Sequence, residues 1–289
     1  NTSQNMGMGN SWIFENTLNY DFSINQMHNF DLLAGTSAER NGLGQNLSVS
    51  NKNNIFDDFK YAYIRNANNT QSGKATIDGT PWGKSGILSY FGRATYDYDE
   101  TYMATLVMRA DGSSNFADGY RWGYFPSVSG GWVISNENFM SSLSPAIGFL
   151  KLRASWGQNG NQSIPKFQYL SLITFNSSNT PANYYFDPNK ENPSIGAYPG
   201  NLPTKDLTWE TSEQLNIGFD ANVFDDRLNI AFDWYKKDTK DWLLPAPILS
   251  SWGVTDPPFI NGGDIRNQGT EIALKWREQE SILQSLAAK

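Results

Sequence analysis

The clearest structural pattern in the sequence lies in residues 86–134, which read GILSYFGRATYDYDETYMATLVMRADGSSNFADGYRWGYFPSVSGGWVI. In the first run, Leu88, Tyr90, Gly92, Ala94 and Tyr96 alternate with Ser89, Phe91, Arg93, Thr95 and Asp97. After an acidic turn at 97–101, a second run from Tyr102 to Asp111 alternates in the same way. Successive side chains of a β-strand point to opposite faces. The pattern therefore predicts two antiparallel strands with one mostly apolar face and one mostly polar face.

Two fold classes fit strands of this kind. A transmembrane β-barrel turns its apolar face outward to lipid and keeps a polar interior. A water-soluble β-sandwich buries its apolar face between two sheets. The alternation by itself leaves both classes open, and the exposure of the apolar face is what distinguishes them.

Five longer motifs resemble the barrel of a SusC/RagA-type TonB-dependent outer-membrane transporter. They are RADGSSNF (109–116), RWGYFPSVSGGW (121–132), LKLRASWGQNGNQ (150–162), LTWETSEQLNIGFDANVFDDRLNIAFDWYKKDTKDWLL (207–244) and NGGDIRNQGTEIALKW (261–276). They follow one another in the family's order. The resemblance covers roughly residues 86–276.

The resemblance implies an all-β fold, namely an antiparallel transmembrane β-barrel segment with long extracellular loops. We expect about nine or ten strands, part of a larger barrel of roughly 22 strands. Residues 1–276 would form this partial barrel. The resemblance also implies a plug domain before the barrel and further C-terminal strands, neither of which is seen in the sequence, and no secretory leader is seen either. Residues 277–289 depart from the pattern, and we expect a short helix or residues added to the native protein.

The resemblance also implies a function and a set of partners. It implies import of oligosaccharides or peptides through the outer membrane of a Gram-negative bacterium, with outer-membrane lipid around the barrel. A SusD-like surface lipoprotein would cap the outer mouth, and TonB would act through the plug. Two alternatives remain at this point: a soluble β-sandwich module that binds carbohydrate, and a porin-like passive channel.

Composition narrows the function classes further. Of the 289 residues 39% are hydrophobic, and no apolar run reaches the length of about 18 residues needed for a membrane-spanning helix. The net charge of −7 argues against nucleic-acid binding, because no basic stripe could neutralise phosphates. The absence of cysteine removes disulfides and thiolate chemistry. We expect no cofactor.

The sequence motifs give little indication of an enzyme active site or a metal site. The glycines at 111–114 and 157–161 lack the Lys-Ser/Thr signature of a phosphate-binding loop. The carboxylate pairs at 97–100 and 225–226 lie in predicted turns, where aspartate bonds to its own backbone. The single histidine, His28, lacks partners at metal-ligand spacing, and we expect it to be a turn residue. We predict no catalytic residue and no metal ligand.

The connections alternate in length along the chain. In addition to the two strands between Leu88 and Asp111, strands are predicted at 12–22, 29–36, 128–134, 149–156, 209–223, 228–234 and 270–276. Short turns fall at 23–28, 97–101 and 225–227, whereas long polar connections fall at 37–84, 111–124, 157–206 and 240–269. All the long connections lie at the same end of the predicted strands. In outer-membrane barrels long loops are extracellular and short turns periplasmic.

Two groups of residues are candidates for a role at the site. Trp82, Trp242 and Trp252 lie on predicted outer loops, where they would either stack on sugar rings or peptide side chains or pack between loops. The second group belongs to the family motifs and is expected to structure loops and lumen: Asp111, Gly112, Ser113, Ser114, Arg121, Trp122, Gly123 and Arg153. An arginine inside a barrel needs a carboxylate partner.

Overall fold

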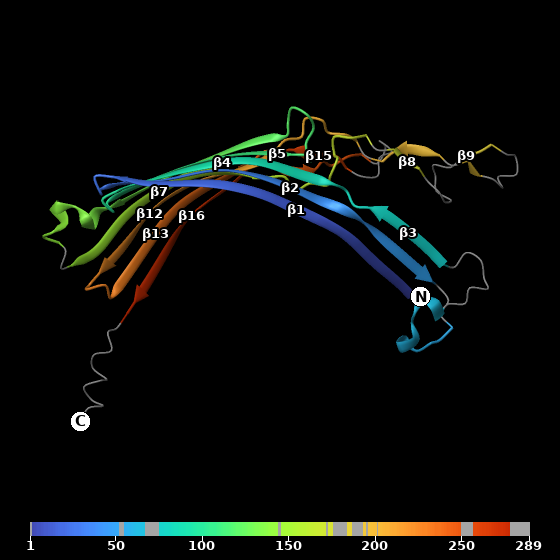
Figure 1. Ribbon diagram of the computed structural model, residues 1–289, viewed down its shortest axis with the longest axis horizontal. Coiled ribbons are helices and arrows are strands. Elements are labelled where there is room, and N and C mark those ends of the chain that lie inside the picture. Colours follow the sequence, from blue (N-terminus) through green and yellow to red (C-terminus); the bar gives the residue numbers. More distant parts are fainter. Residues whose placement is uncertain are drawn as a thin grey trace, which may run out of the picture. The chain divides into compact units, whose positions relative to one another are not determined.

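A computed structural model describes residues 2–51, 55–66, 75–143, 146–171, 173–175, 184–186, 193–194, 196–200, 202–249 and 257–277 (Figure 1). The strands of the main sheet are β1 (Thr2–Ile24), β2 (His28–Asn51), β3 (Ala75–Pro81), β4 (Ser85–Tyr98), β5 (Tyr102–Ser113), β6 (Trp122–Val133), β7 (Ile147–Asn161), β12 (Glu210–Val223), β13 (Leu228–Lys240) and β16 (Ile265–Trp276). Short strands are β8 (Ile173–Phe175), β9 (Tyr184–Tyr185), β10 (Pro193–Ser194), β11 (Ala197–Pro199), β14 (Leu243–Pro245) and β15 (Phe259–Asn261). Single-turn 3₁₀ helices are η1 (Phe59–Tyr61), η2 (Ile64–Asn66), η3 (Ile134–Asn136) and η4 (Asn138–Met140). None of the described helices is long and apolar enough to cross a membrane.

The main sheet has ten strands in the order β1-β2-β4-β5-β6-β7-β12-β13-β16, with β3 paired to β2. Figure 1 shows β7, β12, β13 and β16 running side by side. The predicted all-β fold and the predicted number of strands are confirmed. By contacts the chain divides into a first unit, residues 1–15 with 37–88, and a second unit, residues 16–36 with 89–289.

Three short turns share one backbone conformation. Their central pairs are Asn25-Gln26, Asp99-Glu100 and Asp225-Asp226, and all six residues have φ between 47° and 62°. In each, the fourth residue donates its N–H to the carbonyl of the first at 2.9–3.3 Å. Such mirror-image turns match the twist of the flanking strands. In the second turn the Glu100 N–H also donates to the Asp97 carboxylate at 3.3 Å, which confirms the backbone role predicted for this aspartate.

The sheet extends further toward the long connections than predicted. The expected loop at 37–84 is wrong in part, because β2 continues to Asn51 and β3 pairs with it from Gln45↔Pro81 to Asn51↔Ala75. β7, β13 and β16 are likewise longer than predicted at this end. Ladder hydrogen bonds come from the backbone, so Asn-, Ser- and Gly-rich segments extend a strand when a neighbouring strand is present. Side-chain patterns do not carry that information.

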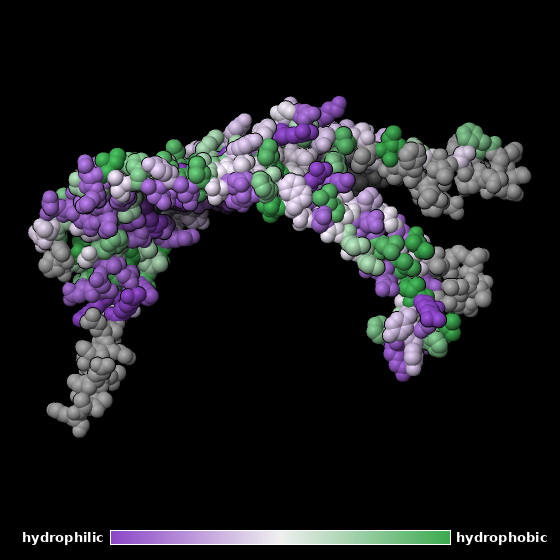
Figure 2. All heavy atoms as spheres, in the orientation of Figure 1, coloured by the Kyte–Doolittle hydropathy of each residue, from purple (hydrophilic) through white to green (hydrophobic). Residues whose placement is uncertain are grey.

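Cross-strand register sorts the second unit into two faces. Gly131, Arg153, Gly218, Asp233 and Glu271 lie in one row, each directly opposite the next, on what we call the polar face. The other side, the apolar face, includes Leu106, Val128, Leu152, Ile217, Phe232 and Ile272. Three of these are well exposed, with Leu106 at 58%, Ile217 at 50% and Ile272 at 67%. Figure 2 accordingly shows hydrophobic residues lying open on the surface beside hydrophilic ones.

This exposure distinguishes the two fold classes. A sandwich would bury the apolar face under a second sheet. The described strands expose it instead, as a barrel does toward lipid. The β-sandwich alternative therefore has no support in the structure.

An aromatic belt runs along the short-turn end of the apolar face. Neighbouring rings lie 4.8–6.2 Å apart between centroids in the pairs Phe22–Phe30, Phe30–Tyr96, Tyr98–Tyr102 and Tyr102–Trp132. His28 belongs to this belt as the first residue of β2, with Nδ1 2.9 Å from the Tyr96 hydroxyl. No cluster of three or more His, Cys, Asp or Glu residues suited to a metal occurs among the described residues.

Glu137, between η3 and η4, holds one end of the aromatic belt. Its Oε1 accepts a hydrogen bond from the Tyr102 hydroxyl at 2.5 Å and another from Trp132 Nε1 at 3.0 Å. We expect Glu137→Ala to lower the free energy of unfolding by about 1–2 kcal/mol, because two hydrogen bonds to a charged acceptor are lost. The loss is measured as a lower temperature for heat-modifiable gel migration of the full-length protein. The exposed Glu15→Ala variant is the control, and equal shifts in both variants would contradict the role given to Glu137.

Candidate functional site

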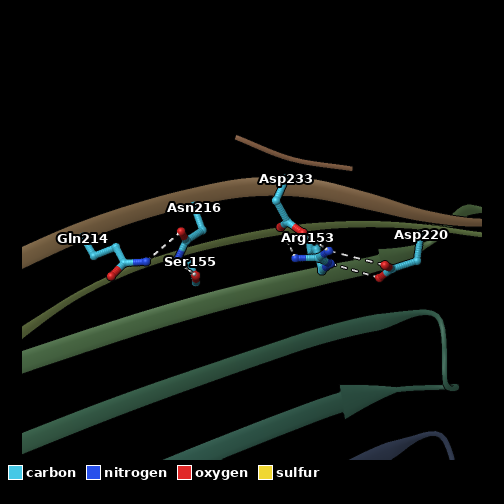
Figure 3. A network of polar contacts seen from close by, with 6 residues as sticks. All are labelled: Arg153, Ser155, Gln214, Asn216, Asp220 and Asp233. Atoms are coloured by element: carbon cyan, nitrogen blue, oxygen red, sulfur yellow. Dashed lines mark hydrogen bonds and ion pairs between the residues drawn. The ribbon is translucent and has the colours of Figure 1, made fainter. Parts of the chain in front are cut away.

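Arg153 is the centre of an ion cluster on the polar face (Figure 3). From β7 its Nε donates to Asp220 Oδ2 on β12 at 2.9 Å. Its Nη2 donates to Asp233 Oδ2 on β13 at 2.8 Å, and its Nη1 also bonds to Asp233. One guanidinium thus ties three neighbouring strands together, and Arg153 has the carboxylate partners expected for an arginine on this face.

Gly218 allows the guanidinium to cross β12. It lies directly opposite both Arg153 and Asp233 in the register. A Cβ at this position would stand 2.6 Å from Asp233 Oδ1, 3.2 Å from Arg153 Cζ and 2.4 Å from the Phe232 carbonyl oxygen. Any side chain would therefore displace the Arg153–Asp233 pair or the backbone of β13.

A Gly218→Ala variant is expected to be destabilised by about 1–2 kcal/mol, since overpacking forces shifts of backbone and side chains. The matched control is Gly130→Ala on β6, where the nearest atom to an added Cβ is the Met103 carbonyl oxygen at 3.8 Å. Thermal unfolding of the full-length protein compares the two. If Gly130→Ala is as destabilising as Gly218→Ala, the close approach at Gly218 is not the cause.

A row of amide and hydroxyl groups lies beside the ion cluster. Gln214 Nε2 donates to Asn216 Oδ1 at 3.0 Å, and Asn216 Nδ2 donates to Ser155 Oγ at 3.4 Å (Figure 3). Next to this row is a hollow of about 390 Å³ that Tyr235, Lys237 and Glu271 also line. A second hollow, of about 310 Å³, is also lined by Ser155 and Asn216, together with Thr105, Ser129 and Lys151 among others. Groups of this kind can hydrogen-bond to sugar hydroxyls or to peptide amides.

Asp111 anchors a second arginine. Arg109 Nε lies 2.8 Å from Asp111 Oδ2, and Arg109 Nη2 donates to the buried Ser89 Oγ at 3.0 Å. The Arg109 guanidinium also lies 5.4 Å from the centre of the Phe91 ring. Arg109 was not among the predicted site residues, although its position on the polar side two residues before Asp111 was a usable signal.

The other motif residues make contacts at the end of β5 and the start of β6, on either side of the connection between these strands. The Ser113 hydroxyl is buried, bonds to Gln162 and accepts the Asn115 N–H at 3.0 Å, while Ser114 lies in the turn that follows. A Cβ on Gly112 would stand 3.0 Å from the Trp122 ring, and one on Gly123 would stand 2.4 Å from Phe125. The Trp122 ring stacks on Tyr90 with 6.1 Å between centroids. Both glycines therefore make room for aromatic rings.

A small hydrophobic core, here called the loop core, consists of Phe116, Phe125, Ile164, Leu207, Trp209 and Leu243. Arg121 fixes it through its backbone carbonyl, which accepts Trp209 Nε1 at 2.9 Å, and through its Nε, which donates to the Phe116 carbonyl at 3.3 Å. The strand predicted at 209–223 is confirmed as β12 from Glu210 onward, and only its first residue differs. Trp209 precedes β12, and its ring lies 5.4 Å from those of Phe116 and Phe125 because this core offers it burial.

The three loop tryptophans do not share one setting. In the first unit, Trp82 donates its Nε1–H to Asn46 Oδ1 at 2.6 Å, and a Cβ on Gly9 or Gly44 would stand 2.3 or 2.8 Å from its ring. In the second unit, Trp242 precedes β14 and is 43% exposed. Trp252 and the tail from 278 onward lie outside the described residues.

Comparison with known proteins agrees with this geometry. A family model described as TonB dependent receptor-like, beta-barrel matches residues 1–288. TonB-dependent receptor P39 of Formosa agariphila is 35% identical over 260 residues, which are 90% of this chain and 23% of that protein. TonB-dependent receptor SusC of Bacteroides thetaiotaomicron is 34% identical over 192 residues, 65% of this chain and 18% of that protein.

Among solved structures, the RagAB peptide importer in its closed-closed state superimposes with a TM-score of 0.77 at 26% identity, covering 94% of this chain and 28% of that one. The chain spans about a quarter of the length of the first curated relatives it matches. With an exposed apolar face, a polar face and short mirror-image turns, the chain belongs to the TonB-dependent receptor-like β-barrel family.

Proposed function

We propose that this chain forms part of the barrel wall of an outer-membrane importer for glycans or peptides. The observation that carries the proposal is its similarity to SusC and to the RagAB peptide importer over most of its length. TonB-dependent receptors of this family are outer-membrane proteins of Gram-negative bacteria. In this proposal the apolar face meets lipid, and the polar face lines the lumen.

The amide and hydroxyl row supports an oligomeric, hydrogen-bonding substrate. Gln214, Asn216 and Ser155 offer donors and acceptors that do not depend on a substrate charge. Trp82, Trp242 and Trp252 are proposed as contacts of the substrate near the outer mouth. The motif residues from Asp111 to Gly123, with Arg153, are proposed to hold loops and lumen in shape rather than to bind the substrate.

The partners follow from the same proposal. A SusD-like surface lipoprotein would sit over the long-loop side, and TonB would act on a plug encoded outside these 289 residues. The remaining barrel strands would also come from the rest of the protein, and residues 277–289 would not belong to the strand pattern. The wall contributes no catalytic group to this scheme.

The test is an uptake experiment in the bacterium that carries the gene. Deleting the gene should abolish uptake of fluorescently labelled oligosaccharides or of labelled oligopeptides, and the intact gene should restore it. Deleting TonB should have the same effect, because import is energised through TonB. If uptake of both probe classes is unchanged in the gene deletion, the importer assignment fails. If uptake needs the gene but not TonB, a porin-like passive channel is the better description.

A further inference from the structure

On the described β-strands from β5 to β16, the charged residues of the apolar face are confined to one place. From Tyr102 on β5 to Gly160 on β7, the described strand positions on this face hold no Lys, Arg, Asp or Glu. On β12, β13 and β16, by contrast, five charged side chains occupy this face: Glu213, Lys236, Asp238, Lys240 and Arg266. Glu213 lies directly opposite Asp238, and Asp238 directly opposite Arg266. We call these five residues the charged cluster.

Two carboxylates hold three cations in the charged cluster. Arg266 Nε and Nη2 lie 2.5 and 3.2 Å from the two Asp238 oxygens, and Lys236 Nζ lies 3.3 Å from Oδ2 of the same carboxylate. Lys240 Nζ lies 2.7 Å from Glu213 Oε2. The charged cluster therefore carries one positive charge in excess.

The cationic side chains of the charged cluster are more exposed than the carboxylates that they bind. The side chains of Arg266 and Lys240 are 62% and 50% exposed, whereas those of Asp238 and Glu213 are 17% and 27% exposed. An ammonium has three N–H donors and a guanidinium five, so each cation keeps donors free after bonding to its carboxylate. The carboxylates thus orient the cations, and the surface offered to a ligand is cationic.

The charged cluster lies at the edge of the apolar band. Trp156 Nε1 donates to Glu213 Oε1 at 2.9 Å, and Trp234 is two residues before Lys236 on the same face. Toward the short turns, beyond Gln268 and Thr270 on β16, the face carries these apolar residues: Leu215, Ile217, Phe219, Ile230, Phe232, Ile272 and Leu274. Tryptophan marks the interface of a membrane, where the apolar band ends. Cations above such a band complement a molecule with an anionic head and hydrocarbon tails.

We propose that the charged cluster binds the phosphate-bearing head group of an outer-leaflet lipid, whose acyl chains lie on the apolar residues below. This rests on the proposed outer-membrane location, with the long connections on the cell surface. The cations complement a phosphate, and the apolar residues below them suit acyl chains. Together these two features favour a phosphorylated lipid over a protein partner. Three cations within reach of one head group suit a phosphate better than a neutral sugar.

The test uses the full-length protein, purified and placed in nanodiscs of neutral lipid with a small fraction of either lipid A or its dephosphorylated form. Native mass spectrometry measures how much of each lipid stays bound. The wild type should retain lipid A over the dephosphorylated form, and K236Q/K240Q/R266Q should lower that preference by about tenfold or more. The control K205Q/K237Q/K275Q removes as many cations outside the charged cluster and should keep the preference.

The other outcomes are decisive as well. Equal retention of the two lipids by the wild type overturns the proposal, and so does an undiminished preference in the K236Q/K240Q/R266Q variant. Complete displacement of lipid A by inorganic phosphate would show a general anion site instead of a lipid site. Retention of a protein in place of lipid would show a partner surface. The lipid readout is independent of uptake, so unchanged uptake in the gene deletion together with an intact lipid preference would count against the proposed import alone.

Discussion

Replacing Phe116 with alanine is expected to lower the free energy of unfolding by about 3–5 kcal/mol, the largest stability effect that we predict for one residue. Its side chain is fully buried, at 0% exposure, in the loop core. Its ring lies 5.4 Å from that of Trp209. Removing the ring leaves a cavity that the surrounding aromatic groups cannot close, because their positions are held by the bond from Trp209 to the Arg121 carbonyl.

The measurement is the temperature at which the full-length protein loses its fast-migrating form on a gel. Limited proteolysis should also become faster in the long connections, since the loop core joins residues from several of them. Phe59→Ala is the control, because Phe59 is 92% exposed and should shift the temperature very little. If Phe116→Ala behaves like Phe59→Ala, the loop core does not hold the connections.

The second large effect is expected for Arg153→Met, at about 2–3 kcal/mol. The substitution leaves the Asp220 and Asp233 carboxylates without the cation that bonds to both. The penalty exceeds that of an ordinary surface pair because two charged acceptors lose their donor together. It stays below the value of a fully buried pair, since all three side chains are about one third exposed.

A combined variant separates charge from packing. Adding Asp220→Asn and Asp233→Asn to Arg153→Met should restore more than half of the lost stability, because no unpaired carboxylate remains. Arg93→Met is the matched control: Arg93 pairs with Asp31 at 3.1 Å with both side chains over 40% exposed, so a loss below about 1 kcal/mol is expected. If the triple variant is no more stable than Arg153→Met, the charge argument is wrong.

Local chemistry made much of the wall predictable from sequence. Alternation from Leu88 to Asp111 defined two strands and their faces, because side-chain direction in a strand has a period of two. The turn at Asp99 and Glu100 was visible from its acidic residues, since aspartate favours turns and tolerates positive φ. The sequence also predicted that Arg153 needs a carboxylate partner, because its position in the strand pattern places it on the polar face.

The choice of partners was decided by the tertiary structure alone. By register Asp220 lies directly opposite Lys151, yet it bonds to Arg153. Gly218 leaves room for the same guanidinium to reach across β12 to Asp233 on β13. Trp209 likewise directly precedes β12, and its ring is buried among residues of the loop core that lie far from it in the sequence. β2 reached Asn51 because β3 offered backbone partners from far along the chain. Sequence periodicity thus determined faces and turns, whereas contacts between distant segments determined which groups meet, since such contacts depend on the room that neighbouring strands leave.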